Sequence, residues 1–143
     1  MRTIHDRFIS AMDRLKDVPL LFFRLILAYG FFQPAMMKIT GLTGVADWFG
    51  SMGYPLPVVS AFLAALTEGL GVVLLTLGLG TRYIAIPLMF VMGVAVFTVH
   101  LSNGFAAGDN GFEIPLYYFL MLFALVVYGS GRISLDHLIS RNR

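Results

Sequence analysis

Apolar residues dominate four continuous stretches of the sequence, and short polar, glycine-rich segments separate them. The stretches cover residues 18–37, 56–79, 83–101 and 113–128. A helix needs about 20 residues to cross the roughly 30 Å of hydrocarbon in a bilayer. Because the apolar runs are continuous rather than alternating, they predict helices and not the strands of a barrel. We therefore expect an all-α protein with a membrane-spanning four-helix bundle.

A second pattern occurs in the connection between the first two stretches. Val45, Trp48, Phe49 and Met52 recur at helical spacing, which predicts a short helix in the membrane interface of this loop. The stretch 113–128 is shorter than the others, so we expect it to begin in the interface.

The N-terminal segment, residues 1–17, is charged but carries an amphipathic stripe through Ile4, Phe8 and Leu15. This stripe favours a helix lying on the membrane surface, and a solvated tail is the alternative. We expect residues 18–130 to form the transmembrane domain and residues 131–143 a tail.

Composition supports a membrane protein. Of 143 residues, 58% are hydrophobic and 13% are charged, and the mean hydropathy is +0.82. Soluble domains are about 45–50% apolar and about 25% charged. The net charge of +2 comes from basic residues that flank the apolar stretches, so it indicates topology rather than nucleic-acid binding. The absence of cysteine excludes disulfides and thiolate-bound iron–sulfur clusters.

The basic residues also predict the orientation. The N-terminal segment, the loop between the second and third stretches and the C-terminal segment are rich in basic residues. They carry Arg2, Arg7, Arg14, Lys16, Arg82, Arg132, Arg141 and Arg143. The loops on the other side carry only Lys38. By the positive-inside rule, we expect both termini in the cytoplasm and the protein in the bacterial inner membrane.

Glu68 is the ionisable residue that lies deepest in an apolar stretch, near the predicted bilayer midplane. Such a group costs at least about 2.5–3.5 kcal/mol on insertion, which makes it the first candidate catalytic residue. Ala61, Ala64, Ala65 and Gly71 share its helix face, so we expect the carboxyl group to face the bundle. It is either a proton acceptor or a structural carboxyl, ion-paired or protonated and hydrogen-bonded.

The first stretch also contains polar candidates. One of its helix faces carries Arg24, Ala28, Phe31, Ala35 and Lys38. Arg24 can reach towards Glu68 as a charge partner or back to the lipid headgroups. Gln33 precedes Pro34, and the kink expected at this proline would place the amide beside a cavity.

His100 ends the third stretch and Glu113 begins the fourth, on the side that we expect to face outwards. Lys38 and Trp48 should lie at the same level, which predicts a polar pocket above Glu68. An imidazole there suits proton exchange or a hydrogen bond to a quinone carbonyl, so His100 is the second candidate catalytic residue. The alternative is that His100 only caps its helix.

Metal sites have little support in the sequence. His5, His100 and His137 fall on opposite sides of the predicted membrane, which leaves a haem without a second ligand. Methionines such as Met36 and Met37 offer thioether ligands for Cu(I), but methionine in apolar helices usually fills packing gaps. We expect no haem, no iron–sulfur cluster and no bound metal.

Several short motifs contain these polar residues. They are Arg24-Leu25, Gly30-Phe-Phe, Lys38-Ile-Thr-Gly41, Trp48-Phe-Gly-Ser-Met-Gly-Tyr-Pro55, Glu68-Gly-Leu-Gly71, Leu77-Gly-Leu-Gly-Thr-Arg82, His100-Leu-Ser-Asn-Gly-Phe105 and Gly129-Ser-Gly-Arg-Ile-Ser-Leu-Asp136. Their order and spacing over residues 20–138 resemble the DoxX family of small bacterial membrane proteins.

The resemblance implies a four-helix inner-membrane bundle. It also implies a redox context. Relatives of the DoxD type are implied to be membrane subunits of thiosulfate:quinone oxidoreductase, and other relatives associate with oxidative-stress or thiol-handling systems. Another branch of the family accompanies metal- or peptide-modification gene clusters, and the segment Asn110-Gly-Phe-Glu113 resembles that branch. The recurrent polar positions of the family are matched by Arg24, Lys38, Glu68, Arg82 and His100.

We therefore expect a membrane subunit or accessory of a quinone- or thiol-linked redox system, in contact with the lipid bilayer and a partner subunit. We expect this subunit to be non-catalytic. If the protein is catalytic, we expect a quinone-linked oxidoreductase subunit. The sequence does not identify a cofactor, and a quinone is compatible with it. The alternatives are an assembly scaffold, and a small transporter or copper-handling accessory protein. A homo-oligomer is compatible with each of them.

Overall fold

The computed structural model describes residues 3–141, and this part of the chain contains helices and loops but no strand. Arg2 and Arg143, which entered the prediction of topology, lie outside the described residues. The helices are α1 (Ile4–Leu15), α2 (Asp17–Thr40), α3 (Leu42–Ser51), α4 (Pro57–Leu77), α5 (Thr81–Ala95), α6 (Glu113–Tyr128) and α7 (Leu135–Arg141). The all-α prediction is confirmed.

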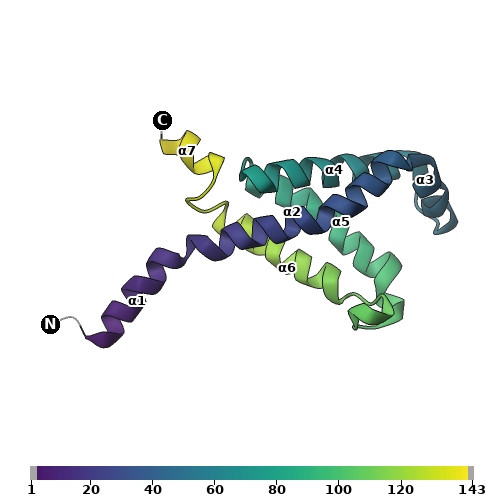
Figure 1. Ribbon diagram of the computed structural model, residues 1–143. Helices are drawn as coiled ribbons and strands as arrows, with labels where there is room; N and C mark the ends of the chain where they lie inside the picture. Colours follow the sequence, from purple (N-terminus) through teal and green to yellow (C-terminus); the bar gives the residue numbers. More distant parts are fainter. Residues whose placement is uncertain (1–2, 142–143) are drawn as a thin grey trace.

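The long helices pack around one apolar core. Helix α2 contacts α4 and α6, and α5 contacts α4 and α6. The largest buried apolar side chains of the core are Leu27, Phe31, Leu75, Leu88, Leu122 and Leu125. In Figure 1, α1 extends away from this core at one end, and α3 lies at the opposite end. The end with α1 also carries α7.

Helix α3 has a small apolar cluster of its own. Ala46 and Phe49 of α3 pack against Ala61 of α4. The predicted helix in the first connection is thus present, and its buried face contacts the start of α4. The predicted N-terminal amphipathic helix is also present as α1, and none of the residues of α1 is buried.

Three helical stretches in the described part of the chain are long and apolar enough to cross a membrane. They are Ile4–Thr40, Pro57–Leu77 and Thr81–Asn103. Helix α6 is apolar but has only 16 residues. At about 1.5 Å per residue it extends about 24 Å, less than the roughly 30 Å of a hydrocarbon core.

Two parts of the chain differ in detail from the prediction. The stretch 83–101 does not end as a regular α-helix, because it changes to a π-helical turn at Val96–His100 and a 3₁₀ turn at Leu101–Asn103. The tail 131–143 contains α7, whose seven residues are too few to produce a clear periodic pattern. Helix α2 continues without a break through Pro34.

Candidate functional site

An ion pair joins α2 to α4 in the interior of the helix packing. The Nζ atom of Lys38 donates to Oε2 of Glu68 at 2.9 Å. The Glu68 side chain is only 3% exposed, and the Lys38 side chain is 13% exposed. Within residues 3–141 this is the only ion pair. A charged pair in an apolar interior must compensate a large desolvation cost, which makes a short hydrogen-bonded geometry necessary.

The helix faces that hold this pair follow the predicted spacing. On α2, Arg24, Ala28, Phe31 and Ala35 are buried, and Lys38 continues the same face with partial exposure. On α4, Ala61, Ala65 and Gly71 are buried together with Glu68. Small residues around the carboxylate let α2 approach closely, so the Lys38 side chain can reach Glu68.

A groove opens beside the ion pair on the outer surface of α2 and α4. Its volume is about 420 Å³. The lining residues are Lys38, Ile39, Leu42, Phe62, Ala65, Leu66, Gly69 and Leu70. Most of them are apolar, and Ile39, Phe62, Leu66 and Leu70 are exposed large hydrophobics. Lys38 is the charged residue of this lining, and it connects the groove to the buried carboxylate.

Arg24 does not pair with Glu68, and it does not extend to the molecular surface. The residue is 1% exposed, and its guanidinium donates from Nη1 to the Leu75 carbonyl at 3.3 Å and from Nη2 to the Ile133 carbonyl. The proposed charge pair of Arg24 with Glu68 is therefore replaced by the pair of Lys38 with Glu68. Arg24 instead satisfies carbonyl groups at the end of α4 and in the C-terminal segment, where helix carbonyls lack partners.

Asp136 is a structural residue that the sequence analysis did not single out. Its carboxylate accepts hydrogen bonds from the backbone amides of Gly80 at 2.8 Å and Thr81 at 3.2 Å, at the start of α5. Its own amide donates to the Gly78 carbonyl at 3.0 Å. The last motif quoted from the sequence ends at Asp136, but spacing alone does not reveal an acceptor that caps a helix 55 residues earlier.

His100 and Glu113 organise the loop between α5 and α6. The Nδ1 atom of His100 lies 2.8 Å from the Asn110 carbonyl, and Glu113 Oε2 accepts from the Ala107 amide at 2.9 Å. Tyr117 donates from its hydroxyl to Glu113 Oε1 at 3.2 Å. No hydrogen bond within residues 3–141 joins this loop cluster to Lys38 or Glu68. The geometry favours the interpretation of His100 as a residue that fixes the end of its helix.

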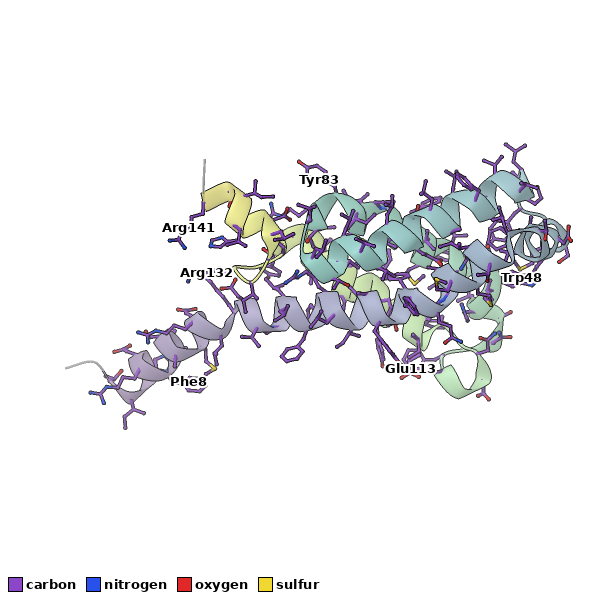
Figure 2. All side chains as sticks on the ribbon, turned by 45° about the horizontal axis from the view of Figure 1, so that its top comes forward. Phe8, Trp48, Tyr83, Glu113, Arg132 and Arg141 are labelled. Atoms are coloured by element: carbon purple, nitrogen blue, oxygen red, sulfur yellow. The ribbon has the colours of Figure 1, made fainter. Side chains whose placement is uncertain are left out.

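Trp48 and Gln33 are both exposed and lie outside the groove. Trp48 packs on Phe49, with ring centroids 5.6 Å apart, and Figure 2 shows it on α3, well separated from Glu113. Gln33 was expected beside a cavity, but its position on α2 turns it away from the buried face. The seven predicted site residues therefore divide among the ion pair, the Arg24 contacts, the loop cluster and two surface positions.

No group of three or more His, Asp or Glu side chains that could hold a metal ion occurs among the described residues. The two-residue site of Lys38 and Glu68 offers one carboxylate and an ammonium group. Such a pair can donate a hydrogen bond and can exchange a proton.

Comparisons with known proteins agree with a membrane location. The chain is 30% identical to "Putative oxidoreductase CatD" of Bacillus subtilis, over 92% of this chain and 95% of that relative. It is 30% identical to "Inner membrane protein YphA" of Escherichia coli, over 85% of this chain and 90% of the relative. An uncharacterized protein of Haemophilus influenzae is 32% identical over 87% of this chain and 85% of its own length.

No solved structure matches the chain significantly. The family profile named DoxX matches residues 19–101, which include most of α2, all of α3, α4 and α5, and the π-helical turn that ends in His100. The sequence resemblance, the profile and the relatives agree, and the chain belongs to the DoxX family of membrane proteins.

Proposed function

We propose that this protein is the membrane subunit of a redox system and that it binds a lipid-soluble carrier of the quinone type beside the Lys38–Glu68 pair. The single observation that carries the proposal is the position of Lys38 in the wall of an apolar groove while its ammonium group is ion-paired with the buried Glu68 carboxylate. A quinone has an apolar ring and two carbonyl oxygens. The groove offers apolar contacts to the ring, and the Lys38 ammonium offers a hydrogen-bond donor to a carbonyl.

Glu68 has a separate role in this proposal. Reduction of a quinone to a quinol consumes two electrons and two protons, with the electrons supplied by a partner subunit. The buried carboxylate of Glu68 is hydrogen-bonded to Lys38, which lines the groove, so it would exchange a proton with the carrier through the lysine. The name of the Bacillus subtilis relative supports a redox context.

The proposal includes a membrane arrangement. Helices α2, α4, α5 and α6 would cross the bacterial inner membrane as a four-helix bundle with both termini in the cytoplasm. Helix α6 would reach the interface through the aromatic residues at its start, which compensate its short length. The distribution of basic residues and the name of the Escherichia coli relative support this arrangement.

The groove can be tested without altering either charge. In Gly69→Leu the new side chain starts in the groove, where a Cβ atom would lie 3.5 Å from Ile39. Gly93→Leu on α5 is the matched control, because a Cβ atom at Gly93 has nothing within 4 Å. Both variants add the same apolar side chain to a transmembrane helix.

The measurement is saturable binding of a short-chain ubiquinone to the purified protein in lipid nanodiscs, with empty nanodiscs as the reference for partition into lipid. The proposal expects saturable binding by the wild type and Gly93→Leu and its loss in Gly69→Leu. Equal binding by the two variants, or partition alone in the wild type, would refute the proposal.

An assembly scaffold is the second candidate, and α1 favours it. This helix extends beyond the core and exposes Ile4, Phe8, Met12 and Leu15 along one face. A partner subunit bound to this face would be lost from a native-membrane purification when Phe8 and Met12 are replaced by serine. Retention of all co-purifying subunits by that variant would exclude α1 as the docking element.

A further inference from the structure

A second cavity lies at the opposite end of the molecule from α3. It has a volume of about 420 Å³ and is formed by the start of α2, the start of α5, the end of α6 and the segment that leads into α7. Arg82, Arg132 and His137 are among the side chains that line it. None of them takes part in the Lys38–Glu68 site, so the cavity is a separate feature of the fold.

The two arginines of this cavity keep most of their donors free. Arg82 donates from Nη2 to the Val127 carbonyl at 3.1 Å, which uses one of five N–H groups. The Arg132 guanidinium forms no hydrogen bond with residues 3–141, and neither arginine lies in an ion pair within that range. Both side chains are exposed and therefore available to an anion.

The two carboxylates of the cavity are already engaged. Asp17 accepts from the backbone amide of Arg132 at 3.1 Å. Asp136 accepts from two amides at the start of α5 and also interacts electrostatically with the buried guanidinium of Arg24. The two arginines and two carboxylates of the lining balance in charge, and the buried Arg24 beside Asp136 brings the net charge around the cavity to +1. The free hydrogen-bond donors of the two arginines face this cavity.

Tyrosines mark the position of this cavity relative to the bilayer. Tyr83 is 84% exposed and Tyr128 is 70% exposed, and both line the cavity at the ends of apolar helices. Exposed tyrosines at helix ends are typical of the boundary between hydrocarbon and headgroups. Figure 2 shows Tyr83 and Arg132 at the same end of the helix packing as Arg141.

We infer that this cavity binds the phosphate group of an anionic phospholipid. Arg82 and Arg132 act as donors to the phosphate oxygens, with His137 beside them, and Tyr83 and Tyr128 contact the glycerol and the start of the acyl chains. Basic pockets at the ends of transmembrane helices are suited to this headgroup chemistry. The inference depends on the membrane location and not on quinone binding.

The test uses the full-length protein in nanodiscs of phosphatidylcholine with an increasing fraction of phosphatidylglycerol. Lipid retention is measured by native mass spectrometry, and thermal stability is measured in parallel. Arg82→Gln/Arg132→Gln is compared with Arg7→Gln/Arg14→Gln on α1, which removes the same charge. Arg82→Lys/Arg132→Lys keeps the charge and shows whether a loss comes from misfolding of the double variant.

The wild type and the α1 variant should retain phosphatidylglycerol preferentially and gain stability from it. Removal of both cavity charges should weaken the preference about thirtyfold, and the lysine variant should recover part of it. Equal retention by the two glutamine variants would overturn the inference. So would equal stabilisation by phosphatidylcholine, or an effect of inorganic phosphate alone that equals the effect of phosphatidylglycerol.

Discussion

Gly78 and Arg24 occupy adjoining space so closely that a Cβ atom on Gly78 would overlap Nη1 of the arginine. Gly78 also has a left-handed backbone, with φ of 65°, and ends α4. The glycine therefore has two separate functions. It allows the turn from α4 to α5, and it leaves room for the guanidinium that binds the carbonyls of Leu75 and Ile133.

Alanine substitution at two glycines separates these functions. Gly80 also has a positive φ, of 57°, but a Cβ atom there has nothing within 4 Å. Gly80→Ala should cost about 1–2 kcal/mol, the strain of the left-handed backbone. Gly78→Ala should cost about 1–3 kcal/mol more, because the new Cβ atom displaces Arg24 from buried carbonyls and also lies 2.6 Å from the Cβ atom of Ser134. Thermal unfolding in detergent measures both, and equal losses would contradict the role given to Arg24.

Asp136 should stabilise the turn from α4 to α5, although it lies far from this turn in the sequence. Asp136→Ala removes the acceptor for the amides of Gly80 and Thr81, and by analogy with helix caps should cost about 1–2 kcal/mol. Asp109→Ala is the control, because Asp109 is exposed and its side chain has no hydrogen bond within residues 3–141. Hydrogen exchange should become faster at Gly80 and Thr81 in Asp136→Ala only. Unchanged protection there would rule out the cap.

The proposed topology can be mapped with single cysteines, since the chain has none of its own. Asp109→Cys lies in the loop before α6, and Arg141→Cys ends α7. A membrane-impermeant maleimide should label Asp109→Cys in cells with a permeabilised outer membrane. Arg141→Cys should react only after the inner membrane is opened. Labelling of both cysteines at the same step would place residues 109 and 141 on the same side of the membrane. That result would contradict a single crossing by α6 between them.

The helices and the inward orientation of Glu68 could be predicted from the sequence. Continuous apolar runs require helices in lipid, and the small residues around Glu68 mark the face that packs against another helix. The face that runs from Arg24 to Lys38 was predictable for the same reason, because helical spacing fixes which residues of one helix lie together.

The partners of these residues could not be predicted. Whether Arg24 or Lys38 meets Glu68 depends on how far α2 is shifted along α4, and periodicity contains no information on that shift. Arg24 contacts a carbonyl 109 residues away, at Ile133, in a segment with no helical pattern. The groove was missed because it arises between two helices, on faces that each look like ordinary lipid-facing surface.

The central claim is that the Lys38–Glu68 pair serves a ligand and does not only join two helices. The double variant Lys38→Glu/Glu68→Lys tests it, because an ion pair can form again while the group at the groove changes from a donor to an acceptor. The decisive measurement is the affinity of this folded variant for short-chain ubiquinone in nanodiscs. The account predicts a loss of at least about tenfold, the value of one charge-assisted hydrogen bond. An affinity equal to that of the wild type would contradict it.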